Sequence, residues 1–189
     1  MKFLNVILLL GLVTVAACSD TPSMHYFQLQ QAPVVNAPAA GSATLVVENV
    51  IVADFLDSNA LVLQKSNVEL VRTQQQQWVE PLGGQLSRNL RAELQRQLPE
   101  VQVLSQATRQ NQPRLLVQVE QFHGSEQGQV FIKVRYSLMY KGKVQPFEYQ
   151  WQQAQPAEGY ASLVETLSNG WQQVGQQIAS QIKELVGKK

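Results

Sequence analysis

The stretch QVFIKVRYSLMY, residues 129–140, carries the clearest alternation of apolar and polar side chains in the chain. Every second residue from Val130 to Tyr140 is apolar or aromatic, and the residues between them include Lys133 and Arg135. Successive side chains of a strand point to opposite faces of a sheet. The alternation therefore predicts a β-strand with one face in the core and the other mostly in water.

The segments on either side of this stretch predict two further strands. Residues 114–122 alternate in the same way before a turn at Gly124–Gly128, and Phe147, Tyr149 and Trp151 alternate with polar residues after a turn at Lys141–Lys143. Short turns join neighbouring antiparallel strands. The pattern predicts a meander of three consecutive antiparallel strands.

Two long amphipathic helices are predicted. The segment 73–98 is expected to carry the first, after Trp78 and with Pro81 in its first turn. A leucine recurs there at every fourth position, at Leu82, Leu86, Leu90, Leu94 and Leu98. The second runs from Tyr160 to Leu185 with apolar residues three and four apart. Its polar face carries Gln rather than the Lys or Arg of a membrane-surface helix, which favours packing on the sheet.

Further strands are predicted at residues 25–30, 44–52 and 101–104, and a hairpin joins 61–64 to 68–71, with a loop over 31–42. Because it is nearly continuous in apolar residues, 44–52 is expected to be covered on both faces. The fold class is α+β: a mostly antiparallel or mixed sheet with two long amphipathic helices packed on it, in a single domain over residues 24–189.

The N-terminus has the layout of a secretory signal: Lys2, an apolar run over 6–12, and small residues up to Cys18. In this position, Val15-Ala16-Ala17-Cys18 resembles the lipobox of bacterial lipoproteins. The resemblance implies a signal peptide over 1–17, lipidation of Cys18 and a tether over 18–23; the alternative is an ordinary secretory signal with a chance Cys. Ser19 stands where inner-membrane retention requires Asp, which favours the periplasmic face of the outer membrane.

Composition narrows the function classes. The 189 residues carry a formal net charge of +1, and loss of Lys2 with the signal would bring it to 0, which gives no electrostatic reason to bind nucleic acid. Cys18 is the only Cys, so no disulfide is expected. No later segment reaches the ~20 apolar residues of a spanning helix. The sequence thus predicts a domain that is anchored to a membrane by its lipid.

The mature chain resembles the ABC-type transport auxiliary lipoproteins, the family of the Pqi-type lipoprotein subunit. The likeness rests on four segments in order: Tyr26–Leu29, Val50–Asp57 running into Leu61–Leu63, Trp78–Leu82 followed by Arg88 and Leu90, and the strand from Leu115 to Phe122 with its hairpin partner. It implies a non-enzymatic outer-membrane subunit of an intermembrane lipid transport system. That subunit would work with an MCE-domain protein of the PqiB-like type and its inner-membrane component, and support envelope integrity.

The candidate partner-binding residues are Asp54, Phe55, Leu56 and Asp57. If this turn is exposed, Phe55 and Leu56 form an apolar contact point between two acids; the alternatives are a cation site, simple turn formation and burial in the core. Family members often have Arg-Pro after Asp57, whereas this chain has Ser58-Asn59. Arg88, Arg91 and Arg96 form either a solvated helix face or a contact for acidic headgroups or a partner.

Catalytic and metal-binding patterns are missing from the sequence. His25 and His123 lack ligand spacing, no G-x-S-x-G or phosphate-binding motif occurs, and Ser125 beside His123 reads as turn chemistry. We expect no enzyme activity, metal or cofactor, which disfavours an envelope hydrolase. A lipid carrier that encloses an acyl chain between sheet and helices is the alternative to an adaptor, and a homo-oligomer is compatible with either.

Overall fold

The structure is a computed structural model that describes residues 23–31, 33 and 43–187. Cys18, the signal and most of the tether, and most of the predicted loop over 31–42 lie outside the described residues. The predictions made for them therefore stay predictions.

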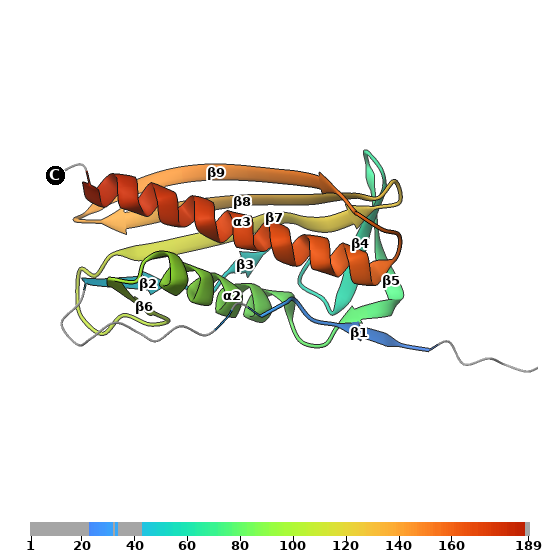
Figure 1. The fold of residues 1–189 in the computed structure, drawn as a ribbon, viewed down its shortest axis with the longest axis horizontal. Coiled ribbons are helices and arrows are strands. Elements are labelled where there is room, and N and C mark those ends of the chain that lie inside the picture. Colours follow the sequence, from blue (N-terminus) through green and yellow to red (C-terminus); the bar gives the residue numbers. More distant parts are fainter. Residues whose placement is uncertain (1–22, 32, 34–42, 188–189) are drawn as a thin grey trace, which may run out of the picture.

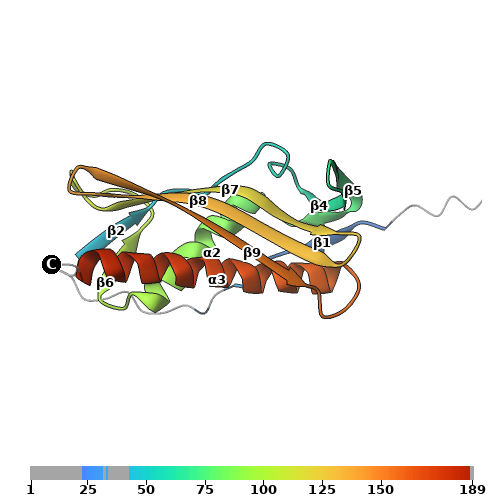
Figure 2. The same ribbon diagram turned by 90° about the horizontal axis from the view of Figure 1, so that it is seen from above.

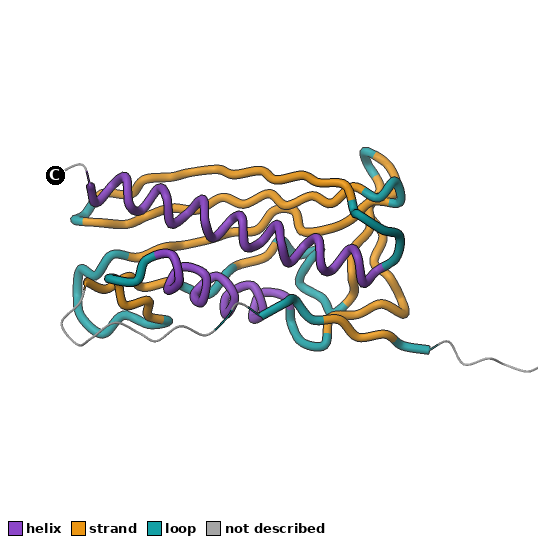
Figure 3. Tube along the Cα trace, in the orientation of Figure 1, coloured by secondary structure: helices purple, strands orange, loops and turns teal. Residues whose placement is uncertain are grey.

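The described chain forms one nine-stranded mixed sheet and two long helices (Figures 1 and 3). The elements are β1 His25–Phe27, β2 Ala43–Val47, β3 Ile51–Val52, β4 Ala60–Ser66, β5 Glu69–Trp78, α2 Leu82–Gln97, β6 Val101–Leu104, β7 Arg114–Ser125, β8 Gln129–Tyr140, β9 Lys143–Ala154 and α3 Tyr160–Gly187. The predicted α+β class with two covering helices is confirmed.

Strand β7 is the central strand of the sheet. One side of β7 pairs antiparallel with β8, which pairs antiparallel with β9, so the predicted meander is confirmed. The other side receives β2, β3 and β4 one after another, each parallel to β7. β6 adds parallel to β2, and β1 adds parallel to β5 at the opposite end.

The turn between β8 and β9 has two residues, Lys141 and Gly142, with φ angles of 51° and 74°. Positive φ at both central residues suits the right-handed twist of a hairpin, and glycine adopts it without steric cost. The turn fixes the pair Tyr140–Lys143 and with it the register of both strands. Tyr136 and Phe147 consequently stack with ring centroids 5.1 Å apart.

Both helices lie on one face of the sheet and leave the opposite face of the meander open (Figure 2). The leucine stripe of α2 is at most 5% exposed, and its burial contributes roughly 1.5–3 kcal/mol per side chain. Trp171 of α3 joins the two helices to the sheet: its indole N–H donates to the Leu86 carbonyl at 3.1 Å, and its ring meets Phe122 edge-on at 6.0 Å.

Three segments differ from the sequence-based expectation. The first strand, predicted over 25–30, ends at Phe27, because the Leu29 N–H donates to the Gln85 side chain and not to a strand. The single strand predicted over 44–52 is split into β2 and β3, because the Val50 N–H turns away from the sheet and donates to the Ser87 hydroxyl. Ile51 is 64% exposed, so the segment is not covered on both faces. The polar run Thr73–Gln77, expected within the helical segment, continues β5, because it pairs with β4 and with β1.

Candidate partner-docking site

Residues Trp78–Leu90 lead from the end of β5 into α2 and form the first half of that helix. We call this segment the junction, because it contacts β1 and the connection before β4. The Trp78 N–H donates to the Asn59 carbonyl, and the Val79 N–H donates to the Phe27 carbonyl at 2.8 Å. Pro81, at the N-cap with φ −52°, then directs the chain into the helix. These contacts fix the start of α2 relative to β1 and to the connection that precedes β4.

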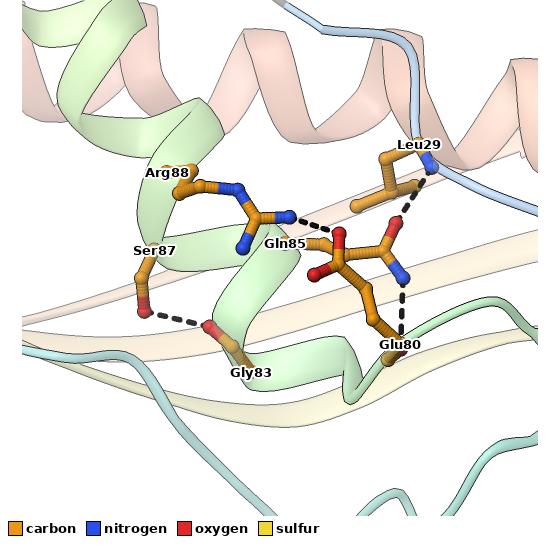
Figure 4. Close-up of polar contacts among 6 residues, drawn as sticks. All are labelled: Leu29, Glu80, Gly83, Gln85, Ser87 and Arg88. Atoms are coloured by element: carbon orange, nitrogen blue, oxygen red, sulfur yellow. Dashed lines mark hydrogen bonds and ion pairs between the residues drawn. The ribbon is translucent and has the colours of Figure 1, made fainter.

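Two polar side chains of α2 secure neighbouring segments (Figure 4). The buried Gln85 amide accepts a hydrogen bond from the Leu29 N–H at 2.8 Å and donates one to the Glu80 carbonyl at 3.0 Å. The Ser87 hydroxyl donates to the Gly83 carbonyl at 2.6 Å and accepts from the Val50 N–H at 2.8 Å. Buried backbone groups need such partners, since an unsatisfied one costs about 1–3 kcal/mol.

Two arginines lie on the exposed side of this junction. Arg88 forms an ion pair with Glu80 across the start of α2 (Figure 4). Arg91 lies one turn further and approaches the Val47 carbonyl at 3.4 Å and the Asn49 side-chain oxygen at 3.5 Å. Partial burial, and then the charge of Arg88, lower the pKa of Arg91, although a guanidinium remains charged at neutral pH.

A cavity of about 590 Å³ opens between α2 and the β2–β3 connection, and we call it the α2 groove. It is lined by Asn49–Val52, Asp57, Pro81, Gly83, Gly84, Ser87, Arg88 and Arg91. The helix approaches the connection closely here, since a Cβ at Gly83 would lie 3.2 Å from the Val50 carbonyl oxygen. The groove combines an apolar wall, which includes exposed Ile51, with two guanidiniums and one carboxylate.

The structure separates the four predicted partner-binding residues. Asp54 and Asp57 are exposed and Phe55 is half-buried, whereas Leu56 is 2% exposed and belongs to the core. Arg72 stabilises the Asp54–Asp57 turn by donating hydrogen bonds to the carbonyls of Asp54 and Phe55 at 3.3 and 3.2 Å. Asp57 reaches the α2 groove.

Arg91 and Ile51 complete the α2 groove. The sequence left a partner contact open for Arg91, together with Arg88 and Arg96, and gave no such role to Ile51. Arg91 looked like one of several helix-surface arginines, and Ile51 looked like part of a covered strand. Ile51 and Arg91 lie close together because the strand breaks at Val50. Asn49 is the one turn-favouring residue at this break, and it stands in an otherwise apolar, β-branched run that predicts one strand.

The described residues assemble no recognisable catalytic or metal centre. His123 is buried, its ring lies 5.4 Å from that of Phe131, and burial lowers its pKa while a hydrogen bond to the Gly124 carbonyl partly opposes this. Ser125 accepts a hydrogen bond from the Gln129 N–H, as expected of turn chemistry. No group of three or more His, Cys, Asp or Glu residues within the described part could hold a metal ion.

Helix α3 packs too closely at two points, once against the sheet and once against α2, to admit another molecule. A Cβ at Gly170 would lie 2.6 Å from both Ile132 and Trp151, and one at Gly175 would lie 2.6 Å from Glu93. An acyl chain could not cross α3 at either position without a large rearrangement. The described core therefore offers no support for the lipid-carrier alternative.

Residues 27–179 match the model of the ABC-type transport auxiliary lipoprotein component. The chain belongs to this family. Its segments from β1 to the last turns of α3 thus follow the family pattern, and the family is one of lipoproteins that assist transport rather than of known enzymes. Neither α2 nor α3 is long and apolar enough to cross a membrane.

Named relatives agree with this family assignment, and two solved structures resemble the fold. The chain is 34% identical over 182 residues to the intermembrane transport lipoproteins PqiC of Escherichia coli K12 and Shigella flexneri, across 92% of this chain and 97% of theirs. It resembles the crystal structure of an uncharacterized protein at 34% identity and a TM-score of 0.76, across 85% of this chain and 99% of that one. Protein XCC0632 of Xanthomonas campestris, 15% identical with a TM-score of 0.65 over 83% and 92% of the two chains, shares the fold.

Proposed function

We propose that this family member is a non-enzymatic subunit of an intermembrane lipid transport system, anchored through lipidated Cys18 at the periplasmic face of the outer membrane. There it docks a periplasmic MCE-domain assembly, which links to an inner-membrane component, and so supports envelope integrity. The observation that carries the proposal is the 34% identity, over nearly the whole of both chains, to intermembrane transport lipoproteins named PqiC.

The docking surface in this proposal is the α2 groove together with the neighbouring Asp54, Phe55 and Asp57. Arginine and apolar side chains that surround a hollow are common among the residues that dominate protein interfaces. Ser87 lines the groove and joins its two walls, since its hydroxyl on α2 accepts a hydrogen bond from the Val50 N–H of the β2–β3 connection. A partner that binds there therefore loses little conformational freedom from this side of the interface.

The proposal is tested by site-specific photocrosslinking in cells. A photoreactive amino acid placed at Ile51, Asp57 or Arg91 is expected to crosslink the full-length chain to the MCE-domain protein. Gln173, an exposed residue of α3 outside the groove, is the control position. Crosslinks from Gln173 alone, or none to any MCE-domain protein, would refute the docking role at this surface.

A further inference from the structure

The described part of the molecule is elongated (Figure 1), and charged residues are distributed differently at its two ends. The tether end contains the start of β1, the β4–β5 turn, the β7–β8 turn and the connection from β9 to α3. The far end contains the β8–β9 turn and the end of α3. Among the described residues, Glu69 and Glu158 belong to the tether end, and neither forms an ion pair there.

The described lysines fall into a paired group and an unpaired group. Lys65 pairs with Glu126 at 3.8 Å, and Lys133 pairs with Glu120 at 3.2 Å. The other described lysines, Lys141, Lys143 and Lys183, have no described carboxylate within 4.0 Å, and all three belong to the far end. Glu184 follows Lys183 at the end of α3 and offsets one of these charges, so the lysine excess at the far end lies at Lys141 and Lys143, where it attracts acidic groups.

The far end also exposes apolar surface beside these lysines. A notch of about 180 Å³ is lined by Leu138, Tyr140, Lys141, Lys143, Gln145 and Leu185. Tyr140 is 36% exposed and Leu185 is half-buried there, whereas Met139 and Val144, paired across β8 and β9, point to the opposite face of the sheet. Lys141 and Lys143 therefore lie beside an apolar floor, where an acid is partly desolvated and interacts more strongly than in open water.

Geometry restricts what can reach this end, provided that Cys18 is the anchor as proposed above. Four residues separate Cys18 from Ser23, so the two lie at most about 18 Å apart, whereas the twelve residues of β8 extend about 40 Å away. The anchoring membrane therefore lies at the tether end. A second copy anchored beside the first would present its own lysines at the same height, where like charges repel.

We propose that the far end, with Lys141 and Lys143 beside the notch of Tyr140 and Leu185, binds an acidic and partly apolar segment of another protein. This surface is separate from the α2 groove. Charge complementarity directs the encounter, and the notch receives an apolar side chain of the segment.

The test uses the full-length chain in neutral detergent and a fluorescent peptide of alternating Glu and Leu, followed by anisotropy at low salt. The variant K141Q/K143Q is expected to weaken binding about fivefold or more, as for the loss of two exposed charge pairs. The matched control is Q74E/Q75E, which lowers the net charge equally at exposed positions of β5 and is expected to change binding less than about twofold.

Three results would overturn the inference: no binding of the peptide at millimolar concentration, equal weakening by K141Q/K143Q and Q74E/Q75E, or binding of phosphatidylglycerol vesicles in place of the peptide. Equal weakening would indicate a net-charge effect, and vesicle binding would indicate a lipid surface. Crosslinking through the α2 groove is expected to be unchanged in K141Q/K143Q, so the two proposals fail independently.

Discussion

The Gln85 side chain makes two hydrogen bonds at the start of α2. Its amide oxygen binds the Leu29 N–H, which no strand partner takes up after β1 ends, and its amide nitrogen binds the Glu80 carbonyl before α2 begins. Glutamine suits this role because one side chain offers both a donor and an acceptor. The contact between the start of α2 and the segment after β1 therefore depends on a neutral side chain that does not titrate.

His123 provides a pH-dependent term in stability. Burial lowers its folded-state pKa below the usual value of 6.5, so the unfolded chain binds a proton at a higher pH than the folded one. The resulting stability is fully present above about pH 6.5 and is lost as the pH falls from there through the folded-state pKa. We expect the free energy of unfolding, measured by urea denaturation from pH 7.5 to 5, to fall less steeply in His123→Phe than in the wild type.

Phenylalanine preserves the ring packed near Phe131 and removes the titrating group, so His123→Phe isolates the protonation term. His25→Gln, at an exposed residue near the tether, is the matched control and is expected to keep the wild-type profile. Parallel profiles for His123→Phe and wild type would show that carboxylates alone set the acid dependence.

Which polar residues become buried could not be predicted from the sequence. Alternation and helical spacing identify the apolar face but treat Gln85, Ser87 and His123 alike as non-core positions. The Asp54–Asp57 turn shows the same limit. Turn chemistry could be inferred from its acids, but only the packed structure shows that Leu56 faces inward while Asp57 faces the groove.

At the scale of elements, glycine positions set how closely α3 approaches the sheet. An added Cβ at Gly170 would overlap Ile132 and the ring of Trp151. Gly170→Ala should therefore destabilise the fold by about 1–3 kcal/mol through overpacking. The higher helix propensity of alanine would offset up to ~1 kcal/mol of this loss. The free energy of unfolding from urea denaturation measures the net effect, for which we expect a loss.

Gly84→Ala is the control for this change, because an added Cβ there would lie in ordinary contact, 3.6 Å from Arg88. It should stabilise the protein by up to ~1 kcal/mol, less in a first turn than in mid-helix. Equal effects of the two substitutions would contradict the close packing of α3 on β8 and β9.

Element prediction succeeded where one periodicity extended over many residues, as in β8 and both helices. It failed at β5, since glutamine by itself favours helix. In the structure, pairing with β4 and β1 decides the conformation of Thr73–Gln77, and such pairing depends on residues distant in sequence.

For the whole molecule, the order of strands around β7 was beyond sequence analysis. The alternating pattern predicts that strands exist and which faces are buried, and short turns predict the meander. It does not show that β2, β3 and β4 share one edge of β7, because these parallel pairings follow long crossovers with no local signal. The α2 groove lies beside one of these pairings and was therefore also hidden.

The N-terminal anchor is the prediction that concerns the whole molecule's place in the cell. Cys18→Ser is expected to abolish palmitate labelling and to release the protein from the membrane fraction. The melting temperature should be unchanged, because the buried core of the described chain begins at Leu29. Retained labelling in Cys18→Ser would contradict lipidation at this residue.

The residue after Cys18 is expected to determine whether the protein is anchored in the inner or the outer membrane. Asp at that position specifies inner-membrane retention in enteric-type lipoproteins, whereas this chain has Ser19 and an Asp only at position 20. Ser19→Asp should therefore move the protein from the outer-membrane to the inner-membrane fraction of a density gradient, and Ser19→Ala, the control, should leave it in place. Both variants should keep palmitate labelling and the melting temperature. A wild-type protein already in the inner-membrane fraction would place the basic far end and the α2 groove on the opposite side of the periplasm from the one proposed.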